Sequence, residues 1–344
     1  SMQTQVASKI VVLGAGNFGT CLTLQLLRQG HRVHLWARSA ELSEGINRNR
    51  VNPKYLSHVQ FPHGVHASSS IQEMFVGSTE KIDLVVLAIP TQSLRSVLSQ
   101  IKDLIPKETI IVSTSKGLEN DSLQLPSQII LSVLGEEWVN SLAVLSGPSF
   151  AAEIAEHQPT ALSVAADDPH PAKVVQKFFH SPRFRVYTGQ DPLGLEVAGA
   201  LKNVIAIASG ACAGLGFQQN SQAALITRGL AEMTRFGVTM GANPMSFLGL
   251  GGMGDLFLTC TSSKSRNYTT GFRLASGLSL EEVLSGLGSV AEGVETAKAA
   301  YQLSCSLGVR APIVTAVYQV LFEEKNLQEA VEVLIAADPR EERA

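Results

Sequence analysis

The sequence predicts an α/β protein with a doubly wound, parallel sheet in its N-terminal half and an all-helical domain in its C-terminal half. The first half alternates short β-rich runs with helical patterns, which is typical of parallel strands joined by crossovers. From Asp191 onward the strand-like runs stop and helical stretches dominate. A chain of 344 residues is also too long for one average core. We therefore expect two domains, 1–190 and 191–344.

These patterns place the expected elements in chain order. We expect strands at Lys9–Leu13, Arg32–Trp36, Leu84–Ala88, Thr109–Ser113, Leu142–Leu145, Ala161–Ala165 and Phe184–Tyr187. The helical patterns between them include Asn17–Gln29, Gln92–Ile101 and Pro126–Leu134. Segment Arg48–Gly64 is rich in Asn, Pro and His, which predicts a long loop. The second domain shows helical stretches at Leu193–Ala213, Ser221–Phe236, Tyr268–Ser276, Leu280–Leu284, Val294–Leu307 and Ala311–Phe322.

Charge and cysteine content exclude several classes of protein. The 27 Lys and Arg residues are balanced by 30 Asp and Glu residues, so no overall field attracts a nucleic acid. The four cysteines are far apart and form no C-x-x-C pair, which favours reduced thiols in a cytoplasmic protein over a zinc site or a disulfide framework. His63 and His66 have no acidic residue nearby in the sequence, and we expect no metal site.

The segment Leu193–Phe217 is long enough to be mistaken for a membrane span. It carries Glu196 and Lys202, and a charge at the centre of a bilayer is costly. We expect Glu196 to lean towards solvent or the helix start, and the segment to form a helix buried in a soluble domain. The first residues, SMQTQVASK, show no apolar signal core. We therefore expect no membrane span. A homodimer is a possible oligomeric state that the sequence neither requires nor excludes.

A dinucleotide site is predicted where the first strand ends. The strand runs into GAGNFG, residues 14–19, a G-x-G-x-x-G turn that opens an apolar helix. Gly14 permits the tight turn, Gly16 lets the backbone approach a pyrophosphate, and Gly19 lets helix and strand pack closely. The pyrophosphate then lies at the helix N-terminus. This context favours a Rossmann-like dinucleotide-binding domain over an ordinary glycine-rich turn.

The end of the second strand bears on which cofactor binds. An acidic residue at that position would accept the ribose 2′-hydroxyl of NAD, but none appears before Glu41. Arg38 stands there instead and can pair with the 2′-phosphate of NADP. The alternative is a solvated surface arginine. We favour NADP and keep NAD open.

Lys202 is the first candidate for the chemistry. Its neighbours Ala200, Leu201, Val204 and Ile205 are apolar, so the pattern predicts a buried lysine. Burial lowers the pKa of an amine, which suits proton transfer. A lysine that reaches solvent with its amino group, or a structural ion pair, would give the same pattern.

Further polar groups follow two strands and a glycine run. Lys116 comes after Thr109–Ser113, and Gly147 and Ser149 come after Leu142–Leu145, at the sheet edge where α/β proteins bind ligands. Asp255 ends the run GLGGMGD and could hold a lysine ammonium. Ser265, Arg266 and Asn267 open a helix, an arrangement suited to a phosphate. The alternative is that the residues after the strands only form loops and that Ser265–Asn267 only cap a helix, without binding a ligand.

Several segments together resemble the bacterial-type NAD(P)-dependent glycerol-3-phosphate dehydrogenases over nearly the whole chain. The segments are GAGNFGT, NPKYL, SKGLE, SGPSFA, GALKNVIAIASG, QAALITRGLAEMTRFG, GLGGMGDLFLTCTS, SRN and VAEGVETA. Small departures concern Asn17, where the family often has serine, and Ala152, where a charged residue is common. Both bear on local contacts or cofactor preference.

The resemblance implies the roles of individual residues. Lys202 would be the proton donor and acceptor at the reacting oxygen. Contacts to the substrate would come from Lys116, Gly147, Ser149, Lys202, Asp255, Ser265, Arg266 and Asn267. The cofactor site would be lined, beside Gly14, Gly16 and Gly19, by Asn17, Phe18, Arg38, Lys116, Ala151, Arg266, Val290 and Glu292.

These implications give a reaction and two alternatives. The expected enzyme reduces dihydroxyacetone phosphate to sn-glycerol 3-phosphate with NADP or NAD as cofactor, reversibly, and supplies phospholipid synthesis. Asp255 would orient the Lys202 ammonium, and Arg266 would anchor the substrate phosphate. A β-hydroxyacid or 6-phosphogluconate-type dehydrogenase shares the two-domain plan with a lysine acid/base but acts on carboxylates. A non-catalytic NADP-binding sensor would have no need of Lys202, Asp255 and the cluster Ser265–Asn267 together.

Overall fold

The computed structural model describes residues 8–75, 81–287 and 291–336. These residues form two compact units, each described by itself below. The first unit runs to Ser115 and also contains Ser127–Leu145 and Ser149–Pro192. The second unit contains the chain from Leu193 onward and two short pieces of the first half, Lys116–Pro126 and Ser146–Pro148. Both pieces lie where a strand of the sheet ends, so the sheet determines where they start.

An eight-stranded sheet organises the first unit, in the order β3-β2-β1-β4-β5-β6-β7-β8. The strands are β1 (Lys9–Leu13), β2 (Arg32–Trp36), β3 (Val65–Ser68), β4 (Ile82–Leu87), β5 (Ile110–Ser113), β6 (Leu142–Ser146), β7 (Thr160–Ala165) and β8 (Phe184–Gly189). β1 pairs in parallel with both β2 and β4, and the chain order reverses at β1. The crevice at such a reversal is where doubly wound sheets bind ligands.

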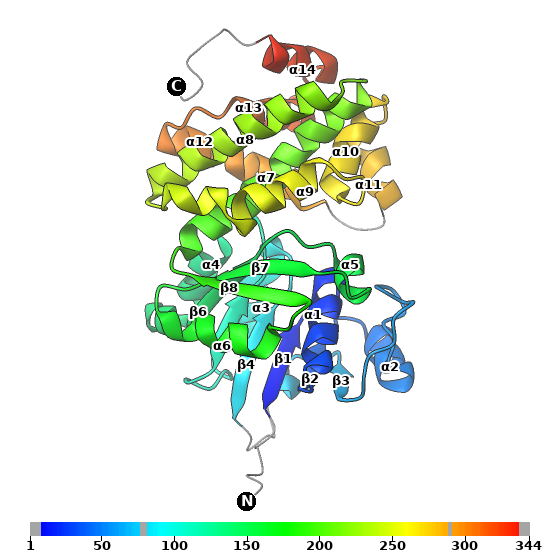
Figure 1. The fold of residues 1–344 in the computed structure, drawn as a ribbon, viewed down its shortest axis with the longest axis vertical. Helices are drawn as coiled ribbons and strands as arrows, with labels where there is room; N and C mark the ends of the chain where they lie inside the picture. The colour runs from blue at the N-terminus through cyan, green and yellow to red at the C-terminus, as the bar shows by residue number, and fades with distance from the viewer. Residues whose placement is uncertain (1–7, 76–80, 288–290, 337–344) are drawn as a thin grey trace, which may run out of the picture. The chain divides into compact units, whose positions relative to one another are not determined.

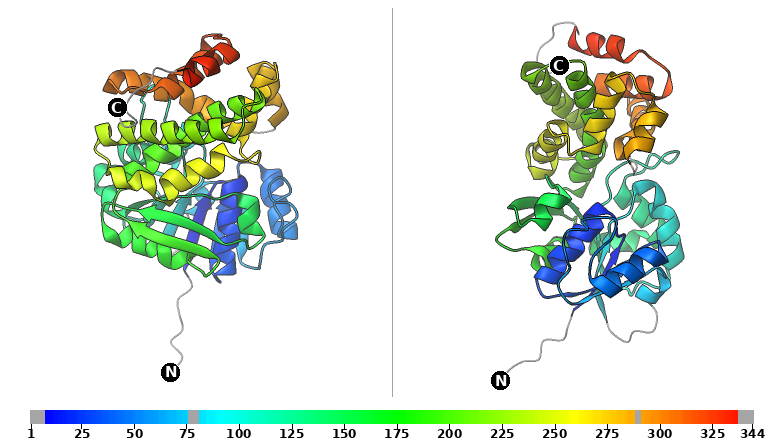
Figure 2. Two further views of the ribbon diagram at one scale, coloured as in Figure 1. Left: turned by 45° about the horizontal axis from the view of Figure 1, so that its top comes forward. Right: turned by 90° about the vertical axis from the view of Figure 1, so that its right-hand side faces the viewer.

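Alternate residues of the strands face opposite sides of the sheet, and helices cover both sides (Figures 1 and 2). Ile10 and Val12 belong to one core with α1 (Asn17–Arg28) and α6 (Pro169–Phe179). Val11 and Leu13 belong to the other core with α3 (Thr91–Ile101) and α4 (Pro126–Leu134). The remaining helical elements are α2 (Ala40–Asn49), α5 (Ala151–Ala155) and the 3-10 turns η1 (Gln72–Met74) and η2 (Glu136–Ser141).

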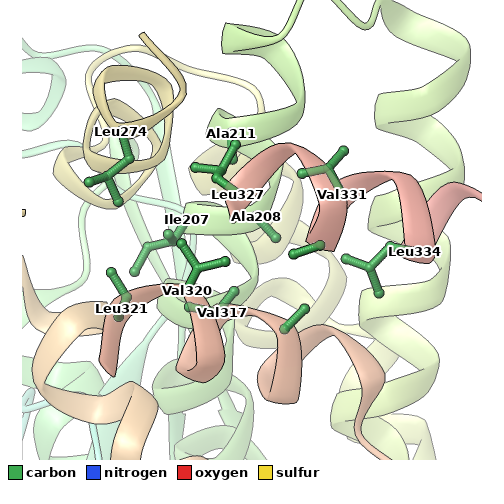
Figure 3. Close-up of a pocket in the computed structure, with 12 residues that line it drawn as sticks. Ile207, Ala208, Ala211, Leu274, Val317, Val320, Leu321, Leu327, Val331 and Leu334 are labelled. Atoms are coloured by element: carbon green, nitrogen blue, oxygen red, sulfur yellow. The ribbon is translucent and has the colours of Figure 1, made fainter. Parts of the chain in front are cut away.

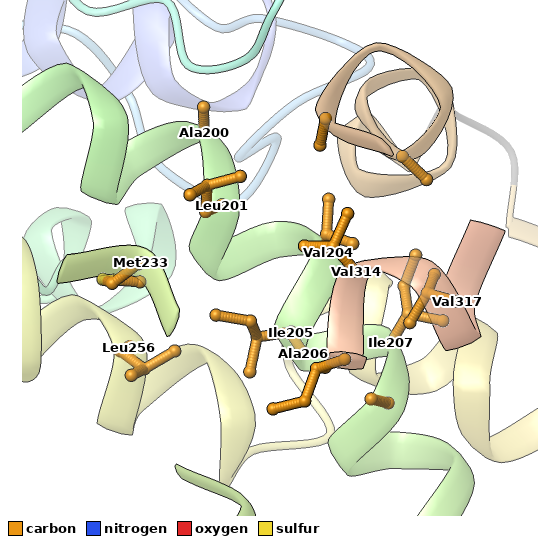
Figure 4. Packing of buried hydrophobic residues seen from close by; sticks show 14 of the residues in the cluster. Ala200, Leu201, Val204, Ile205, Ala206, Ile207, Met233, Leu256, Val314 and Val317 are labelled. Carbon is orange, nitrogen blue, oxygen red and sulfur yellow. The ribbon is translucent and has the colours of Figure 1, made fainter. Parts of the chain in front are cut away.

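The second unit is built from helices, and among its described residues only Ser146, the last residue of β6, belongs to a strand. The helices are α7 (Pro192–Gly214), α8 (Gln219–Met240), α9 (Asp255–Cys260), α10 (Arg266–Ala275), α11 (Leu280–Leu287), α12 (Glu292–Leu307), α13 (Pro312–Phe322) and α14 (Leu327–Ile335), with η3 (Pro244–Leu248) and the π-turn η4 (Leu250–Gly254). α7 forms the centre: its residues from Ala200 to Ile207 pack among side chains such as Met233, Leu256 and Val314 (Figure 4). This cluster is the core of the second unit.

The predicted fold class is confirmed, and the seven expected strands agree with the structure to within two residues at each end. The prediction missed β3, whose four residues VHAS contain no apolar run because it lies at the edge of the sheet. It also missed α2, which buries only Ser43 and Ile46, the 11-residue helix α6, and the short helices α5, α9 and α14. The expected loop Arg48–Gly64 is confirmed for residues 50–64, whereas Arg48 and Asn49 are the last residues of α2.

Among the described residues, α7 is the helix long and apolar enough to cross a membrane, yet 89% of its most apolar stretch is buried inside the protein. A core helix meets the same criteria of length and composition, and the prediction of a buried helix is confirmed. The expectation that the Glu196 side chain leans towards solvent is wrong, because Glu196 is only 3% exposed. α7 is covered on nearly all sides, so this position has no solvent face.

Candidate active site

Two lysines share one buried aspartate in the second unit. The Lys202 amino group donates to Oδ1 of Asp255 at 2.7 Å, and the Lys116 amino group donates to Oδ2 at 2.9 Å. The Asp255 side chain is 2% exposed, whereas those of Lys202 and Lys116 are 10% and 16% exposed. A buried carboxylate is tolerated when it is paired and hydrogen-bonded, and here both oxygens have a cationic donor. The two ammonium groups therefore lie side by side against one anion.

Thr259 completes this cluster and was not identified from the sequence. Its hydroxyl accepts from the Lys202 amino group at 3.2 Å and donates to Oδ1 of Asp255 at 3.3 Å. Thr259 lies four residues after Asp255 on α9, so the two side chains share a helix face. That spacing is visible in GDLFLTC, but it could be used only if the segment had been predicted as a helix.

Local packing explains how the lysines reach Asp255. Lys202 projects from α7, whose burial leaves its side chain no route to bulk solvent along most of its length. Lys116 follows β5 and lies against α7 at Gly199, where an added Cβ would lie 3.4 Å from the Lys116 Cγ. The absent side chain at Gly199 thus leaves room for the Lys116 stem to pass.

Burial and mutual charge separate the pKa values of the two lysines. Burial lowers the pKa of Lys202 to about 8; Asp255 opposes this effect and the Lys116 charge reinforces it. Burial also disfavours the charged form of Lys116, but Asp255 outweighs it and the pKa of Lys116 is raised. Burial alone would raise the pKa of Asp255, but the two ammonium groups hold it below its ordinary value. Lys202 is therefore the group of this cluster that can exchange a proton near neutral pH.

A chain of amides connects the residue next to Lys202 to two other helices. The Asn203 side chain donates to Oε2 of Glu292 at 3.4 Å and accepts from Asn267 at 3.1 Å. Asn267 in turn accepts from the backbone N–H of Gly293 at 2.8 Å. Burial raises the pKa of Glu292, against the lowering effect of Lys116 and Lys202. The network ties the starts of α10 and α12 to α7.

The predicted phosphate cluster opens α10. Ser265 caps this helix by accepting from the backbone N–H of Tyr268 at 3.2 Å, and Arg266 is its first residue. Asn267 and Ser265 are buried, whereas Arg266 is half-buried. A capped helix N-terminus with an arginine is a combination that attracts phosphate groups.

The other predicted substrate residues follow β6. Gly147 is buried in the second unit, and Ser149 is half-buried at the start of the next piece of the first unit. Ser146, the last residue of β6, has a buried hydroxyl with no hydrogen-bond partner in the structure. A Cβ on Gly199 would lie 3.7 Å from this hydroxyl, so Ser146 lies against the same part of α7 as Lys116.

The three predicted cofactor glycines, Gly14, Gly16 and Gly19, follow β1 in the first unit. Gly14 has φ +117°, and a Cβ there would lie 2.2 Å from the Ala88 carbonyl oxygen. A Cβ on Gly19 would lie 1.9 Å from the Gly14 carbonyl oxygen, whereas a Cβ on Gly16 would meet nothing within 4 Å. Gly14 and Gly19 thus form a tight strand-to-helix turn, and Gly16 presents bare backbone to open space. This is the cradle that a pyrophosphate requires, so the residues fit a dinucleotide.

The remaining cofactor candidates differ in how close to this turn they lie. Asn17 and Phe18 are the first residues of α1, directly after Gly16. Arg38 follows β2, is exposed, and has its guanidinium 5.9 Å from the Trp36 ring centroid. Ala151 begins α5, which packs against α1 and whose Ala155 carbonyl accepts from Arg28 at 2.7 Å. Lys116, Arg266 and Glu292 lie in the second unit, and Val290 lies outside the described residues.

An apolar cavity elsewhere in the second unit is distinct from this site. It measures about 30 Å³ and lies among α7, α10, α13 and α14, where aliphatic side chains such as Ile207, Leu274 and Val331 line it (Figure 3). It offers no group that could bind a phosphate or transfer a proton. Among the described residues, no three His, Cys, Asp or Glu side chains come together as metal ligands would.

A dinucleotide cradle on a doubly wound sheet and a buried lysine–aspartate cluster in a helical unit define the class of NAD(P)-dependent dehydrogenases. Comparison with known proteins narrows this class. Residues 9–172 match the family description "NAD-dependent glycerol-3-phosphate dehydrogenase N-terminus", and residues 191–332 match the corresponding C-terminus. The chain belongs to the NAD-dependent glycerol-3-phosphate dehydrogenase family.

Individual relatives agree over nearly the full length. The chain is 46% identical over 338 residues to the glycerol-3-phosphate dehydrogenase (NAD(P)+) of Geobacter sulfurreducens, covering 98% of this chain and 100% of that protein. It is 47% identical over 334 residues to the protein of that name from Leptospira biflexa, covering 97% and 99%. The crystal structure of a glycerol-3-phosphate dehydrogenase from Coxiella burnetii matches with a TM-score of 0.90 at 34% identity, covering 96% and 99%.

Proposed function

We propose that this protein catalyses the reversible reduction of dihydroxyacetone phosphate to sn-glycerol 3-phosphate with NADPH or NADH, as the names of its relatives indicate. The observation that carries the proposal is the Lys202 amino group held 2.7 Å from buried Asp255 with a pKa of about 8. Such an amine can donate a proton to a developing alkoxide and take it back in the reverse direction.

We assign cofactor binding to the first unit and catalysis to the second. Gly14, Gly16 and Gly19 would hold the pyrophosphate of the dinucleotide, whose reduced nicotinamide supplies the hydride when bound. We propose residues 1–190 as the cofactor-binding domain and 191–344 as the catalytic domain. Lys116–Pro126 and Ser146–Pro148 are then contributions of the first half of the chain to the catalytic unit.

Protonated Lys202 has two roles in the proposed reduction. It donates a proton to the oxygen on C2 of the substrate, and its charge stabilises that oxygen as negative charge develops there. Asp255 and Thr259 fix the position of the amino group through the contacts of 2.7 and 3.2 Å. Burial, reinforced by the positive charge of Lys116, keeps the pKa of Lys202 low enough for the proton to leave. Without Lys116, Lys202 would be a weaker acid.

The start of α10 would bind the substrate phosphate. Arg266 supplies the charge, and Ser265 and Asn267 supply the capped helix start that the amide network ties to Asn203, next to Lys202. Binding the phosphate at a fixed point relative to Lys202 positions the reacting carbon. We expect Gly147 and Ser149 to contact the substrate and Asn17, Phe18, Arg38 and Ala151 to contact the cofactor.

The proposal is tested by following the absorbance of NADPH after dihydroxyacetone phosphate is added to purified protein, and by repeating this with NADH. Turnover with this substrate, and none with small 3-oxo acids, is expected. Turnover confined to the oxo acids would favour a β-hydroxyacid dehydrogenase, and cofactor binding without turnover of any ketone would favour a sensor. Faster turnover with NADPH would support the role of Arg38 at the 2′-phosphate.

We further propose a cytoplasmic location and a supply of glycerol 3-phosphate to phospholipid synthesis. All four cysteines are free, and three of them are buried, which suits a reducing compartment. A homodimer stays a prediction. Light scattering on the full chain tests it: a mass of twice 36.7 kDa would support the dimer, and a mass of 36.7 kDa would contradict it.

A further inference from the structure

The segment NPKYL has no part in the chemistry described above, yet it contains a buried polar side chain. Asn52 is 1% exposed, although Pro53 and Lys54 beside it are exposed. It lies in the long loop after α2, far along the chain from the glycine turn of residues 14–19. A buried asparagine in an exposed loop needs partners for both ends of its amide.

Asn52 has four such partners, in two groups. Its Nδ2 donates to the Ala15 carbonyl oxygen at 3.0 Å and to the Thr20 hydroxyl at 2.9 Å. Its Oδ1 accepts from the backbone N–H groups of Lys54 and Tyr55, both at 3.0 Å. The amide oxygen therefore stabilises the loop that contains Asn52, and the amide nitrogen binds the glycine turn.

The contact with Ala15 determines where the next N–H points. The Ala15 carbonyl and the Gly16 N–H belong to one planar trans peptide, in which they point in opposite directions. Asn52 holds the carbonyl inward, and the Thr20 hydroxyl supports it by donating to the same oxygen at 3.3 Å. The Gly16 N–H must then point away from Asn52. Gly16 is also the residue of the turn with open space beside it.

We propose that Asn52 is a positioning residue for the cofactor: it locks the Ala15–Gly16 peptide so that the Gly16 N–H faces the pyrophosphate of the dinucleotide. This inference rests on the proposed function, because it assumes that the glycine turn binds a dinucleotide. It also assigns a structural role to the loop of residues 50–64, because the hydrogen bonds of Asn52 attach this loop to the glycine turn. Ligands that lack a pyrophosphate do not use the Gly16 N–H and do not depend on Asn52.

The test compares ADP-ribose, which carries a pyrophosphate, with adenosine, which carries no phosphate, by calorimetry or ligand-detected NMR on the full chain. Asn52→Asp keeps the acceptor for Lys54 and Tyr55 but replaces the donor to Ala15 with an oxygen. Thr20→Val removes the supporting hydroxyl without adding a charge. Asn47→Asp is the matched control, because Asn47 makes two hydrogen bonds with the backbone of Ala67, away from the glycine turn.

The inference predicts a selective loss. Asn52→Asp should raise the Kd of ADP-ribose about tenfold and Thr20→Val about threefold, since a lost buried hydrogen bond has about this effect. The Kd of adenosine should stay within about twofold in both variants, and Asn47→Asp should change neither. Equal losses for both ligands, or no loss in Thr20→Val, would overturn the inference. If wild-type protein binds no ADP-ribose, the proposed function itself fails, which is a separate outcome.

Discussion

Replacing Asp255 by Asn should shift the pH dependence of catalysis towards acid. In the wild-type protein Lys202 has a pKa of about 8, and ketone reduction requires its protonated form. The rate of reduction should therefore be constant below about pH 8 and fall above it. Oxidation of glycerol 3-phosphate requires the neutral amine and should rise through the same pH.

The size of the shift follows from the contact with Asp255. The Lys202 amino group lies 2.7 Å from Oδ1, and both side chains are buried. Coulomb's law with an effective dielectric constant of about 20 gives about 6 kcal/mol at this distance, an upper bound. Opposite charges this close shift pKa values by about 1–3 units in proteins. With a shift of about 2 units, only about a tenth of Lys202 stays protonated at pH 7, so reduction slows at least tenfold.

The assay is the pH profile of kcat/KM in both directions, measured by NADPH absorbance. Asp168→Asn serves as the control, because it makes the same substitution at the cap of α6, where Asp168 accepts from the His170 N–H, outside the lysine–aspartate cluster. The reasoning is refuted if the descending limb of the Asp255→Asn profile stays near pH 8 or moves to higher pH. An equal displacement in Asp168→Asn would also refute it.

Three further predictions concern Arg266, Thr259 and Glu232. Arg266→Ala should raise the KM for dihydroxyacetone phosphate at least tenfold with a smaller change in kcat; an unchanged KM would mean that the phosphate binds elsewhere. Thr259→Val should lower kcat severalfold with little change in KM, because the hydroxyl positions Lys202 at 3.2 Å; a KM effect alone would contradict this. Glu232 accepts from the N–H groups of Ile313 and Val314, both at 3.0 Å, and burial raises its pKa from 4.5 to about 7. The folded protein therefore binds the proton more tightly than the unfolded chain, and stability should fall by about 3 kcal/mol as the pH rises from 4.5 to 7. Glu232→Gln should flatten this dependence in urea unfolding; an unchanged slope would show that other groups cause it.

The sequence predicts most of the fold because its inner strands, such as β1, β5 and β6, are buried on both faces. Runs such as KIVVL and IDLVVL each contain one charged residue and are otherwise apolar, so their positions are visible without any tertiary information. β3 and α2 were missed because they lie at the edge of the sheet, where few side chains are buried and no apolar period develops. α9 was missed because GLGGMG before it resembles a flexible loop.

The candidate site could be predicted only in part. Burial of Lys202 follows from its apolar neighbours, and Asp255 was expected to hold a lysine. That Lys116 also binds the Asp255 carboxylate could not be foreseen, because Lys116 and Asp255 are 139 positions apart in the sequence. Asn203 and Asn52 were missed for the same reason. Their partners lie on other elements, and an asparagine in a helix or a loop carries no local sign of what it contacts.

The central claim is that Lys202 transfers the proton, and the Lys202→Ala variant tests it most directly. The measurement is the single-turnover rate of NADPH oxidation by dihydroxyacetone phosphate, with the Kd of NADPH determined on the same sample. We predict a rate at least a hundredfold below wild type, an almost unchanged Kd, and partial recovery of the rate with added methylamine. A variant that keeps most of the wild-type rate would contradict the assignment of Lys202.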